Sequence, residues 1–243
     1  MLCVRSAAAA LVRAVSLACC VCASAGPTWA SDDATVLVFS GIDLWRDGQF
    51  MHGGFLWSPG GLDQEGFILK AMVSGGRYRY LSGALNNIWV TGTEEGVQVL
   101  PGWHFKWNRL ETKLFAGLDI KNDITVPFDP SNGLHGTAIG ARVTVDLWFE
   151  PTPATMLAAN ASLTSINTDY AARIAYGWRW HDWFYVGPEA QAYACEGYRQ
   201  MRLGVHLTAL KTGGWEWSAG GGWSHTDDSR TGAYLRLGIL TRL

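Results

Sequence analysis

The side chains that could do chemistry in this sequence are scattered rather than grouped. Carboxylates at Asp119, Glu189 and Glu216 could supply the two acids of a glycosidase, but nothing in the sequence places two of them at catalytic separation. The Gly-x-Ser-x-Gly turn of a serine hydrolase does not occur. The histidines, which lack the spacing of metal ligands, are His52, His104, His135, His181, His206 and His225. We therefore expect no catalytic activity, no metal and no cofactor.

The segments that carry these groups have the pattern of β-strands. In residues 198–210, apolar side chains such as Leu203 and Val205 alternate with polar ones such as Arg202 and His206. A period of two places the apolar side chains on one face of a strand and the polar ones on the other. The same pattern suits a strand over a soluble core and a strand between lipid and a polar lumen. Alternation alone therefore leaves open which face is wet.

Similar segments of about ten residues, separated by turn residues, follow one another to the C-terminus. We expect strands at 35–46, 49–58, 66–80, 87–107, 110–120, 136–149, 154–166, 170–180, 183–195, 198–210, 214–224 and 231–242. An even strand count, with both termini on one side, is what a bacterial outer-membrane barrel requires. The sequence predicts an all-β fold, a single antiparallel transmembrane β-barrel of about 12 strands, with 87–107 open as one strand or two.

The positions of the aromatic residues favour the membrane interpretation. If the first strand runs outward from the periplasm, the ends of later strands place many tryptophans at the periplasmic rim. These membrane-interface aromatics are Trp57, Trp103, Trp107, Trp148, Trp178, Trp180, Trp183, Trp215 and Trp217. The outer rim would collect Trp45, Tyr78, Tyr80, Trp89 and Trp223. Two such bands are expected at the two membrane–water interfaces.

The polar faces of the same strands would line the lumen. The lumen-facing candidates, in which basic groups outnumber acidic ones, are Lys70, His104, Lys106, Glu111, Lys113, Asp119, Arg142, Asp146, Arg173, Arg179, Glu189, Arg202, His206, Glu216 and Arg236. Water or salt bridges would satisfy such a lining without a specific ligand. Aromatic rings among the polar groups, as at Tyr185 and Tyr193, would also suit a polar polymer such as a sugar chain. The sequence leaves open whether the lumen is open and whether such a polymer contacts it.

Loop lengths agree in part with this orientation. The connections at 108–109 and 181–182 are short and fall on the predicted periplasmic side, and the long connection at 121–135 falls on the outer side. Residues 58–66 depart from the rule, because they form a long connection on the periplasmic side.

Composition limits the class of protein. Charged residues make up 16% of the 243-residue chain, while Trp occupies 13 positions, and soluble domains usually contain roughly 25% charged residues. The formal net charge of -2 gives no basis for nucleic-acid binding. Of the five cysteines, Cys195 alone lies outside the first 22 residues, and we expect it to be a small strand residue.

The N-terminus has the features of an export signal. An apolar run follows two arginines, and small-residue cleavage patterns end at Ala25 and Ala30. We predict a cleaved signal peptide over residues 1–30 and an outer-membrane barrel domain over residues 31–243, with cleavage after Ala25 as the alternative.

Several stretches of the chain resemble a known family. "HGGFLWSPGGLDQEGFILK" from His52, "DLWFEPTPATMLAANASL" from Asp146 and "YRQMRLGVHLTALKTG" from Tyr198 look like the cellulose biosynthesis protein BcsS family of alphaproteobacteria. The likeness runs from Gly41 to the C-terminus. It implies a role in bacterial cellulose production or export at the envelope, and it brings no catalytic motif.

The barrel and the resemblance together give the expected function. We expect an accessory protein of cellulose biosynthesis, exported to the bacterial outer membrane, that acts as a pore, an anchor or a polysaccharide-interacting component. Outer-membrane lipid is an expected partner, and the resemblance adds cellulose or another glucan and other cellulose-synthesis components. No nucleic acid is expected, and the oligomeric state is open. The alternatives are an outer-membrane enzyme that modifies lipid or glycan, and a soluble periplasmic β-barrel binder.

Overall fold

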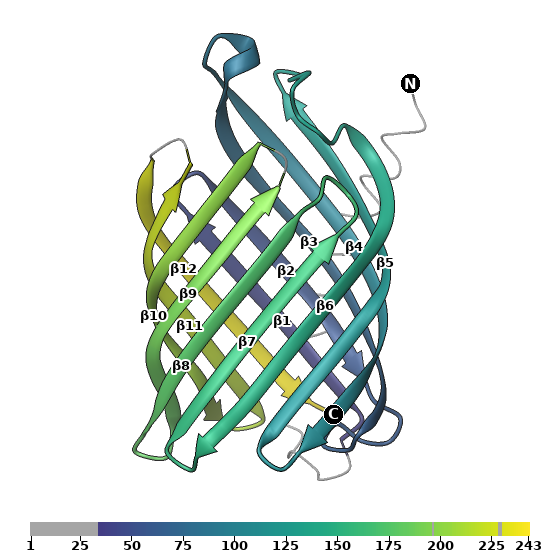
Figure 1. Ribbon diagram of the computed structural model, residues 1–243, viewed down its shortest axis with the longest axis vertical. Helices are drawn as coiled ribbons and strands as arrows, with labels where there is room; N and C mark the ends of the chain where they lie inside the picture. The colour runs from purple at the N-terminus through teal and green to yellow at the C-terminus, as the bar shows by residue number, and fades with distance from the viewer. Residues whose placement is uncertain (1–33, 196, 228–229) are drawn as a thin grey trace.

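The computed structural model describes residues 34–195, 197–227 and 230–243. The predicted signal peptide over residues 1–30 lies outside the described residues. In the described part of the chain, twelve antiparallel strands close into one barrel, in which each strand pairs with its neighbours in sequence and the last pairs with the first (Figure 1). The prediction of an all-β, twelve-strand antiparallel barrel is confirmed.

The strands are β1 (Val36–Trp45), β2 (Gly48–Trp57), β3 (Gly66–Ser82), β4 (Ile88–Trp107), β5 (Leu110–Val126), β6 (Gly136–Thr152), β7 (Thr155–Thr164), β8 (Tyr170–Trp180), β9 (Phe184–Cys195), β10 (Tyr198–Thr212), β11 (Trp215–Thr226) and β12 (Thr231–Arg242). The segment 87–107 is thus one strand. No helix of the described residues is long and apolar enough to cross a membrane.

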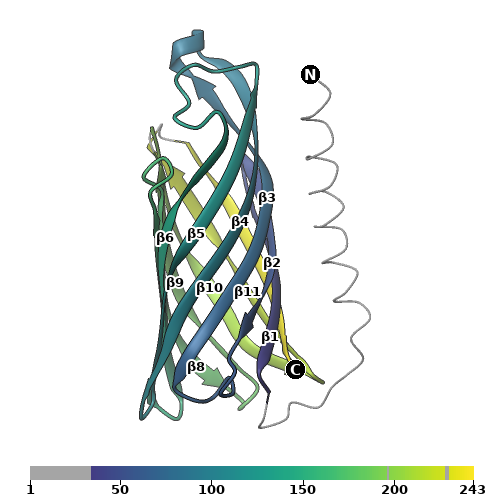
Figure 2. The ribbon, with the colours of Figure 1, turned by 90° about the vertical axis from the view of Figure 1, so that its right-hand side faces the viewer.

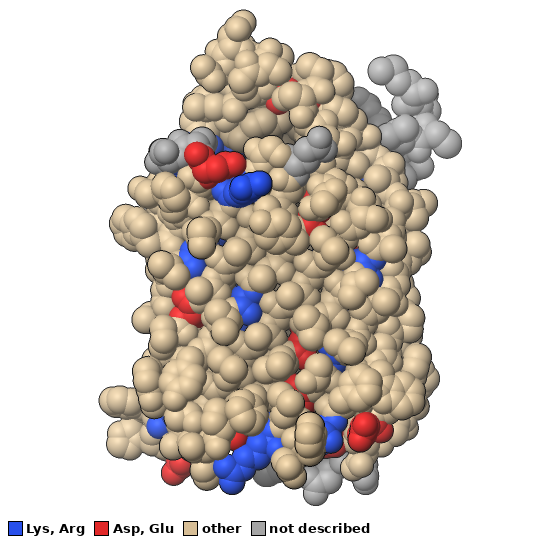
Figure 3. All heavy atoms as spheres, in the orientation of Figure 1, with Lys and Arg blue, Asp and Glu red and all other residues tan. Residues whose placement is uncertain are grey.

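Side chains alternate between an apolar outer wall and a polar lumen, as the period of two predicts. On β10, Leu203 has 66% of its surface exposed on the outside, whereas Arg202 has 3% exposed on the inside. On the face that Figure 3 shows, uncharged residues cover most of the wall, and charged side chains show mainly near its two ends. An outer wall of this kind suits a lipid solvent, because a soluble protein rarely exposes so large an apolar surface.

Both described chain ends lie at the same end of the barrel. The backbone N–H of Thr35 donates to the carbonyl of Leu243 (3.0 Å), and the N–H of Leu243 donates to the carbonyl of Val36 (2.8 Å). We call this end the terminal end and the other end the loop end. Connections at the terminal end are short except for residues 58–65, which form the terminal-end turn.

The wall is higher on one side at the loop end. Figures 1 and 2 show the hairpin of β3 and β4, with β5, rising above the other strands. β5 continues to Val126, so the connection predicted at 121–135 covers only 127–135. The alternation persists in this extension, because Tyr78 donates to Asp123 (2.6 Å) and Tyr80 donates to Asp129 (2.8 Å) on the inside. Burial would raise the pKa of Asp129, but hydrogen bonds from Ser131 and Tyr80 prevail and lower the pKa to about 2.

One bulge shifts the alternation near the terminal end of β10. The pairing with β11 slips by one residue between Leu207 and Leu210, and Ala209 has a φ of 63°. After the slip, Leu210 pairs with the outward Trp217 and Lys211 pairs with the inward Glu216. A bulge adds one residue to one strand and so restores the match between its apolar positions and the outer face.

Replacing Leu203 by Arg should impair insertion of the barrel into lipid. A charge on the lipid face near the bilayer midplane costs roughly 2–4 kcal/mol. The fraction of folded protein in lipid vesicles, measured by the heat-dependent shift of the folded band on a gel, should fall for Leu203→Arg. The matched Leu203→Ile variant should fold like the wild type. Equal folding of Leu203→Arg and the wild type would mean that Leu203 does not face lipid.

Candidate functional site

The strand register places the predicted lumen residues on the inward face. All fifteen follow the inward alternation of their strands, and their contacts form two clusters on opposite walls plus a terminal-end group. The inward set is Lys70, His104, Lys106, Glu111, Lys113, Asp119, Arg142, Asp146, Arg173, Arg179, Glu189, Arg202, His206, Glu216 and Arg236. The lumen is therefore the candidate functional site.

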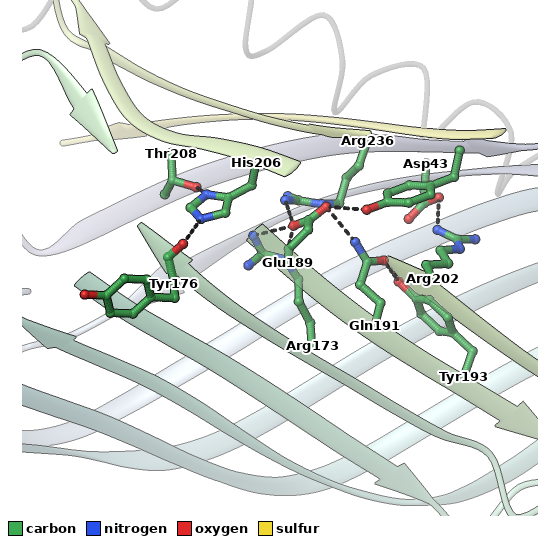
Figure 4. A network of polar contacts seen from close by, with 11 residues as sticks. Asp43, Arg173, Tyr176, Glu189, Gln191, Tyr193, Arg202, His206, Thr208 and Arg236 are labelled. Carbon is green, nitrogen blue, oxygen red and sulfur yellow. Dashed lines mark hydrogen bonds and ion pairs between the residues drawn. The ribbon is translucent and has the colours of Figure 1, made fainter. Parts of the chain in front are cut away.

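Glu189 on β9 is the centre of the first cluster. Its side chain is fully buried, and its carboxylate accepts hydrogen bonds from Arg173 Nε (2.8 Å), Arg236 Nη2 (3.0 Å), the Tyr234 hydroxyl (2.9 Å) and Gln191 Nε2 (2.9 Å). Figure 4 shows Arg173 and Arg236 converging on Glu189. A buried carboxylate needs such partners, because desolvation without them costs several kcal/mol. The donors come from β8, β9 and β12, so the cluster connects three strands and spans the inner face of β10 and β11 between them.

A glycine leaves the space that this carboxylate occupies. A Cβ atom at position 220 on β11 would collide with Glu189 Oε1 and approach Arg236 Nη2 to 3.1 Å. Gly220 therefore serves packing inside the barrel.

Arg202 extends the first cluster toward the loop end. Its Nη1 donates to Asp43 Oδ1 on β1 (2.6 Å), and its Nε donates to Gln200 Oε1 (2.8 Å). The guanidinium carbon lies 4.7–5.3 Å from three ring centroids, those of Trp45, Tyr193 and Tyr234. Charge pairing and ring contacts thus hold one cation in place. β10 and β1 are separated by two strands, so this pair crosses the curved inner surface of the barrel.

His206 is held by two hydrogen bonds. Its Nε2 lies 3.1 Å from the Tyr176 carbonyl, and its Nδ1 lies 2.9 Å from Thr208 Oγ1, as Figure 4 shows. A carbonyl can only accept, so Nε2 carries the proton and Nδ1 accepts from the Thr208 hydroxyl. Both ring nitrogens are therefore engaged in the structure, and neither faces a serine or a carboxylate.

The second cluster covers the opposite wall, on β3 to β6. Asp119 is fully buried and accepts from Arg142 Nε (3.0 Å) and Nη2 (2.9 Å). Lys70 reaches Asp146, three strands away, at 3.4 Å. Lys121 pairs with Asp169 and also lies 3.7 Å from Glu94.

The terminal-end turn folds into the mouth of the barrel. Leu62 packs with Leu56, Leu100 and Phe115 in one apolar cluster, and its N–H donates to the Ala34 carbonyl (2.8 Å). The long connection that departs from the loop-length rule is thus an ordered covering of the mouth. Its apolar contacts explain why it can turn inward, because burying a leucine contributes roughly 1.5–3 kcal/mol.

Polar contacts join the same turn to the strands around it. Arg242 donates to both oxygens of Asp63 (3.1 Å each), and Lys106 Nζ donates to the Asp63 carbonyl (3.2 Å). His104 Nδ1 donates to the Gln64 carbonyl (2.9 Å), which directs Nε2 toward Glu111 (3.5 Å). His104 therefore supports the turn.

A cavity of about 360 Å³ lies next to the terminal-end turn. One part of its lining is apolar and includes Phe39, Leu62 and Leu240, and another part carries Lys70 and Asp146. Acidic and basic groups both border the cavity, so its electrostatics suit a neutral polar guest or water better than an ion.

Most predicted interface aromatics lie at the terminal end and are exposed, but one does not. The exposed ones are Trp57, Trp103, Trp107, Trp178, Trp180, Trp183 and Trp217, and Trp215 is half-buried. Trp148 instead faces inward, opposite Glu111, where its ring contacts Tyr185 (5.9 Å between centroids) and its Nε1 donates to Glu150 (3.1 Å). The prediction that Trp148 lies at the membrane interface is therefore wrong. Trp148 has the same parity as the inward Asp146, and its position along the strand alone does not reveal this direction.

The predicted outer aromatic band needs a larger correction. Trp45 contacts Arg202 inside the barrel, and Tyr78 and Tyr80 bind inward carboxylates. Only two members of the predicted band, Trp89 and Trp223, are exposed. The two rims of the barrel are therefore not alike.

Apart from Lys121, the lumen groups absent from the sequence-based set include the carboxylates Asp43, Glu94, Asp123, Asp129 and Asp169. They reduce the predicted excess of basic groups. Asp43 shares the face of Phe39 and Trp45, and strict alternation along β1 could have identified it. Asp123 and Glu94 follow the alternation of their strands, but Asp123 was assigned to a loop. Asp169 lies outside a strand, so no periodicity could have found it. The described residues hold no group of three His, Cys, Asp or Glu that could bind a metal.

Comparison with known proteins identifies the sequence family and the fold. Residues 37–243 match the family described as cellulose biosynthesis protein BcsS. None of the curated proteins matches the chain.

Three solved structures illustrate the fold. The KdgM porin is 14% identical, with 85% of this chain and 99% of that chain covered and a TM-score of 0.51. The TodX deltaS2S3 mutant monoaromatic hydrocarbon channel is 9% identical, with 88% and 91% covered and a TM-score of 0.56. A KdgM porin in complex with disordered oligogalacturonate is 12% identical, with 85% and 99% covered and a TM-score of 0.50. Identities this low show the fold alone, that of an outer-membrane-type β-barrel.

Replacing Glu189 by Gln should destabilise the barrel strongly. The change keeps the shape but removes the charge that two buried arginines share, and breaking a buried pair costs about 3–5 kcal/mol. Urea unfolding in lipid vesicles, followed by tryptophan fluorescence, should show a lower free energy of unfolding for Glu189→Gln. The control, Glu216→Gln, changes a half-buried carboxylate near the terminal end and should stay within about 0.5 kcal/mol of the wild type. Equal losses in both variants would contradict the central role of Glu189.

Proposed function

Because the chain belongs to the cellulose biosynthesis protein BcsS family, we propose that it serves bacterial cellulose production as an accessory barrel of the outer membrane. The match over residues 37–243 is the observation that carries the proposal, since it covers the barrel from β1 to the end of the chain. Export through the N-terminal signal would bring the chain to the periplasm, with the terminal end of the barrel on the periplasmic side.

Outer-membrane lipid is the proposed solvent of the outer wall. The exposed apolar side chains on β10 and the exposed tryptophans near the terminal end support this partner. A soluble periplasmic binder would not gain from exposing them.

We propose a structural or binding role without catalysis. The buried groups that could act as acid or base are already paired: Glu189 with two arginines, Asp119 with Arg142, and His206 with Thr208 and a carbonyl. A general base must reach the proton of a substrate, and in these three groups the existing contacts already engage the side chain.

Among the possible roles we favour contact with polysaccharide over a permanently open pore. Ion pairs cross the inner surface between strands three positions apart, and the terminal-end turn covers the mouth. A related fold, the KdgM porin, has been seen with an oligogalacturonate. Here the lumen combines paired charges of both signs with the rings of Trp45, Tyr193 and Tyr234, which suits hydroxyl-rich, uncharged glucan better than an acidic sugar polymer.

Deleting the gene in a cellulose-producing strain should reduce extracellular cellulose. The proposed role places the protein at the final, outer-membrane stage, so a defect there should lower the amount of polymer outside the cell. Extracellular glucan, hydrolysed and quantified as glucose, should fall clearly below the wild-type amount and return on complementation with the full chain. Unchanged cellulose after deletion would contradict the proposed function.

Removing the contacts of the terminal-end turn should increase ion passage. Leu62→Asn with Asp63→Asn takes away the apolar anchor and the ion pair with Arg242. Single-channel conductance in planar bilayers should be low for the wild type and higher for the double variant. The control Gln64→Ala keeps Leu62 and Asp63, and it should behave like the wild type because Gln64 contacts His104 through its backbone carbonyl. A high wild-type conductance that the double variant leaves unchanged would show that the turn does not close the mouth.

A further inference from the structure

A cluster of exposed arginines lies on the outer face of the barrel at the loop end. The exposed tryptophans, by contrast, are concentrated at the terminal end. On β3 the outward side chains Leu69, Ala71 and Val73 are followed by Arg77 and Arg79. Their outward direction follows from the alternating tyrosines, which bind carboxylates inside. The basic side chains therefore interrupt the apolar outer wall near the loop end, where Ile124 and Val126 on β5 are also exposed.

A largely buried aspartate, with 11% of its side-chain surface exposed, organises the arginines. Asp47, in the turn between β1 and β2, lies 3.4 Å from Arg79 Nε, 3.3 Å from Arg230 Nη1 and 3.9 Å from Arg46 Nε. The Arg79 N–H also donates to the Asp47 carbonyl (2.8 Å). Arg46 and Arg79 share this one carboxylate with Arg230. Asp47 thus positions the arginines.

An indole ring lies between two of the guanidinium groups. The centroid of Trp89 lies 5.1 Å from the Arg79 guanidinium carbon and 5.2 Å from that of Arg230. Contacts of this kind restrict arginine rotamers and reduce the entropy lost when a ligand binds. The arginines are therefore arranged before any ligand arrives.

The donors remain accessible. Side-chain exposure is 57% for Arg79 and 48% for Arg46. Arg77 is exposed and makes no ion pair with the described residues. The outward acid of neighbouring β4, Glu95, pairs in register with Gly75, one outward position closer to the apolar wall than Arg77.

We propose that Arg46, Arg77 and Arg79 bind the phosphate groups of the phosphorylated glycolipid of the outer leaflet. Guanidinium groups recognise phosphate oxygens through paired N–H donors, and basic clusters at the membrane surface bind lipid headgroups. The acyl chains of such a lipid can lie along the outward Val73 and Met51 while its phosphates reach the arginines. A soluble phosphate would gain nothing from this adjacent apolar wall. The inference rests on the proposed outer-membrane location and identifies the lipid partner.

Native mass spectrometry of the detergent-purified protein can test the inference with diphosphoryl lipid A, monophosphoryl lipid A and inorganic phosphate as probes. The wild type should retain diphosphoryl lipid A, and it should retain monophosphoryl lipid A less well. Arg77→Gln with Arg79→Gln should weaken binding of diphosphoryl lipid A about tenfold or more, since each basic group near a membrane surface contributes on the order of 1 kcal/mol. The matched control, Arg109→Gln with Lys211→Gln, removes two exposed charges at the terminal end and should bind like the wild type.

Arg77→Gln alone keeps the test valid if the double variant misfolds, because Arg77 has no ion pair that folding would lose within the described residues. This single change should still weaken binding. Equal binding by the wild type and both loop-end variants, or retention of inorganic phosphate without diphosphoryl lipid A, would overturn the inference. Recovery of the protein in the soluble periplasmic fraction would instead overturn the proposed location, whatever the lipid result.

Discussion

Pairing of β1 with β12 is the constraint on which the rest of the structure depends. It closes the sheet, so every strand has two neighbours and no edge remains open to solvent or lipid. In a closed sheet, alternate side chains of each strand must face the outside and the lumen in turn. A single slip would exchange the two faces, and the bulge near Ala209 shows how β10 keeps its apolar residues outside when the pairing changes.

The narrow interior then determines what the polar side chains can do. Groups that meet inside a closed barrel are partly removed from water, so each charge needs a partner. Glu189 with Arg173 and Arg236, and Asp43 with Arg202, meet this requirement by contacts between strands that are distant in sequence. The same contacts tie the strands together from within. Ion-paired side chains therefore fill the central part of the lumen. The cavity beside the terminal-end turn is a local space next to them.

Much of this fold could be predicted from the sequence, because alternation is a local property. Twelve segments, their order and the direction of the fifteen polar side chains follow from periodicity and turn residues. The partners of Glu189 could not be predicted, because register and curvature bring them together. Trp148, Tyr78 and Tyr80 were misplaced for a related reason: their height along the barrel suggested an interface, whereas their parity directs them inward. Residues 58–65 exceeded the expected turn length, and the fold uses the extra length to cover the mouth.

The two rims of the barrel differ in the kind of side chain they expose, and each kind suits a different membrane surface. Indole rings prefer the interface between hydrocarbon and headgroups and need no charged partner, and they are concentrated at the terminal end. Guanidinium groups are stable in an interface when anionic groups are near. The cluster beside Asp47 and Trp89 lies at the loop end, while the terminal end also exposes Arg109 and Lys211 outside any such cluster. A barrel in a symmetric bilayer would have no use for this difference. If the loop-end arginines bind phosphorylated lipid as proposed, an asymmetric membrane with that lipid in one leaflet would match each rim and would place the loop end outward.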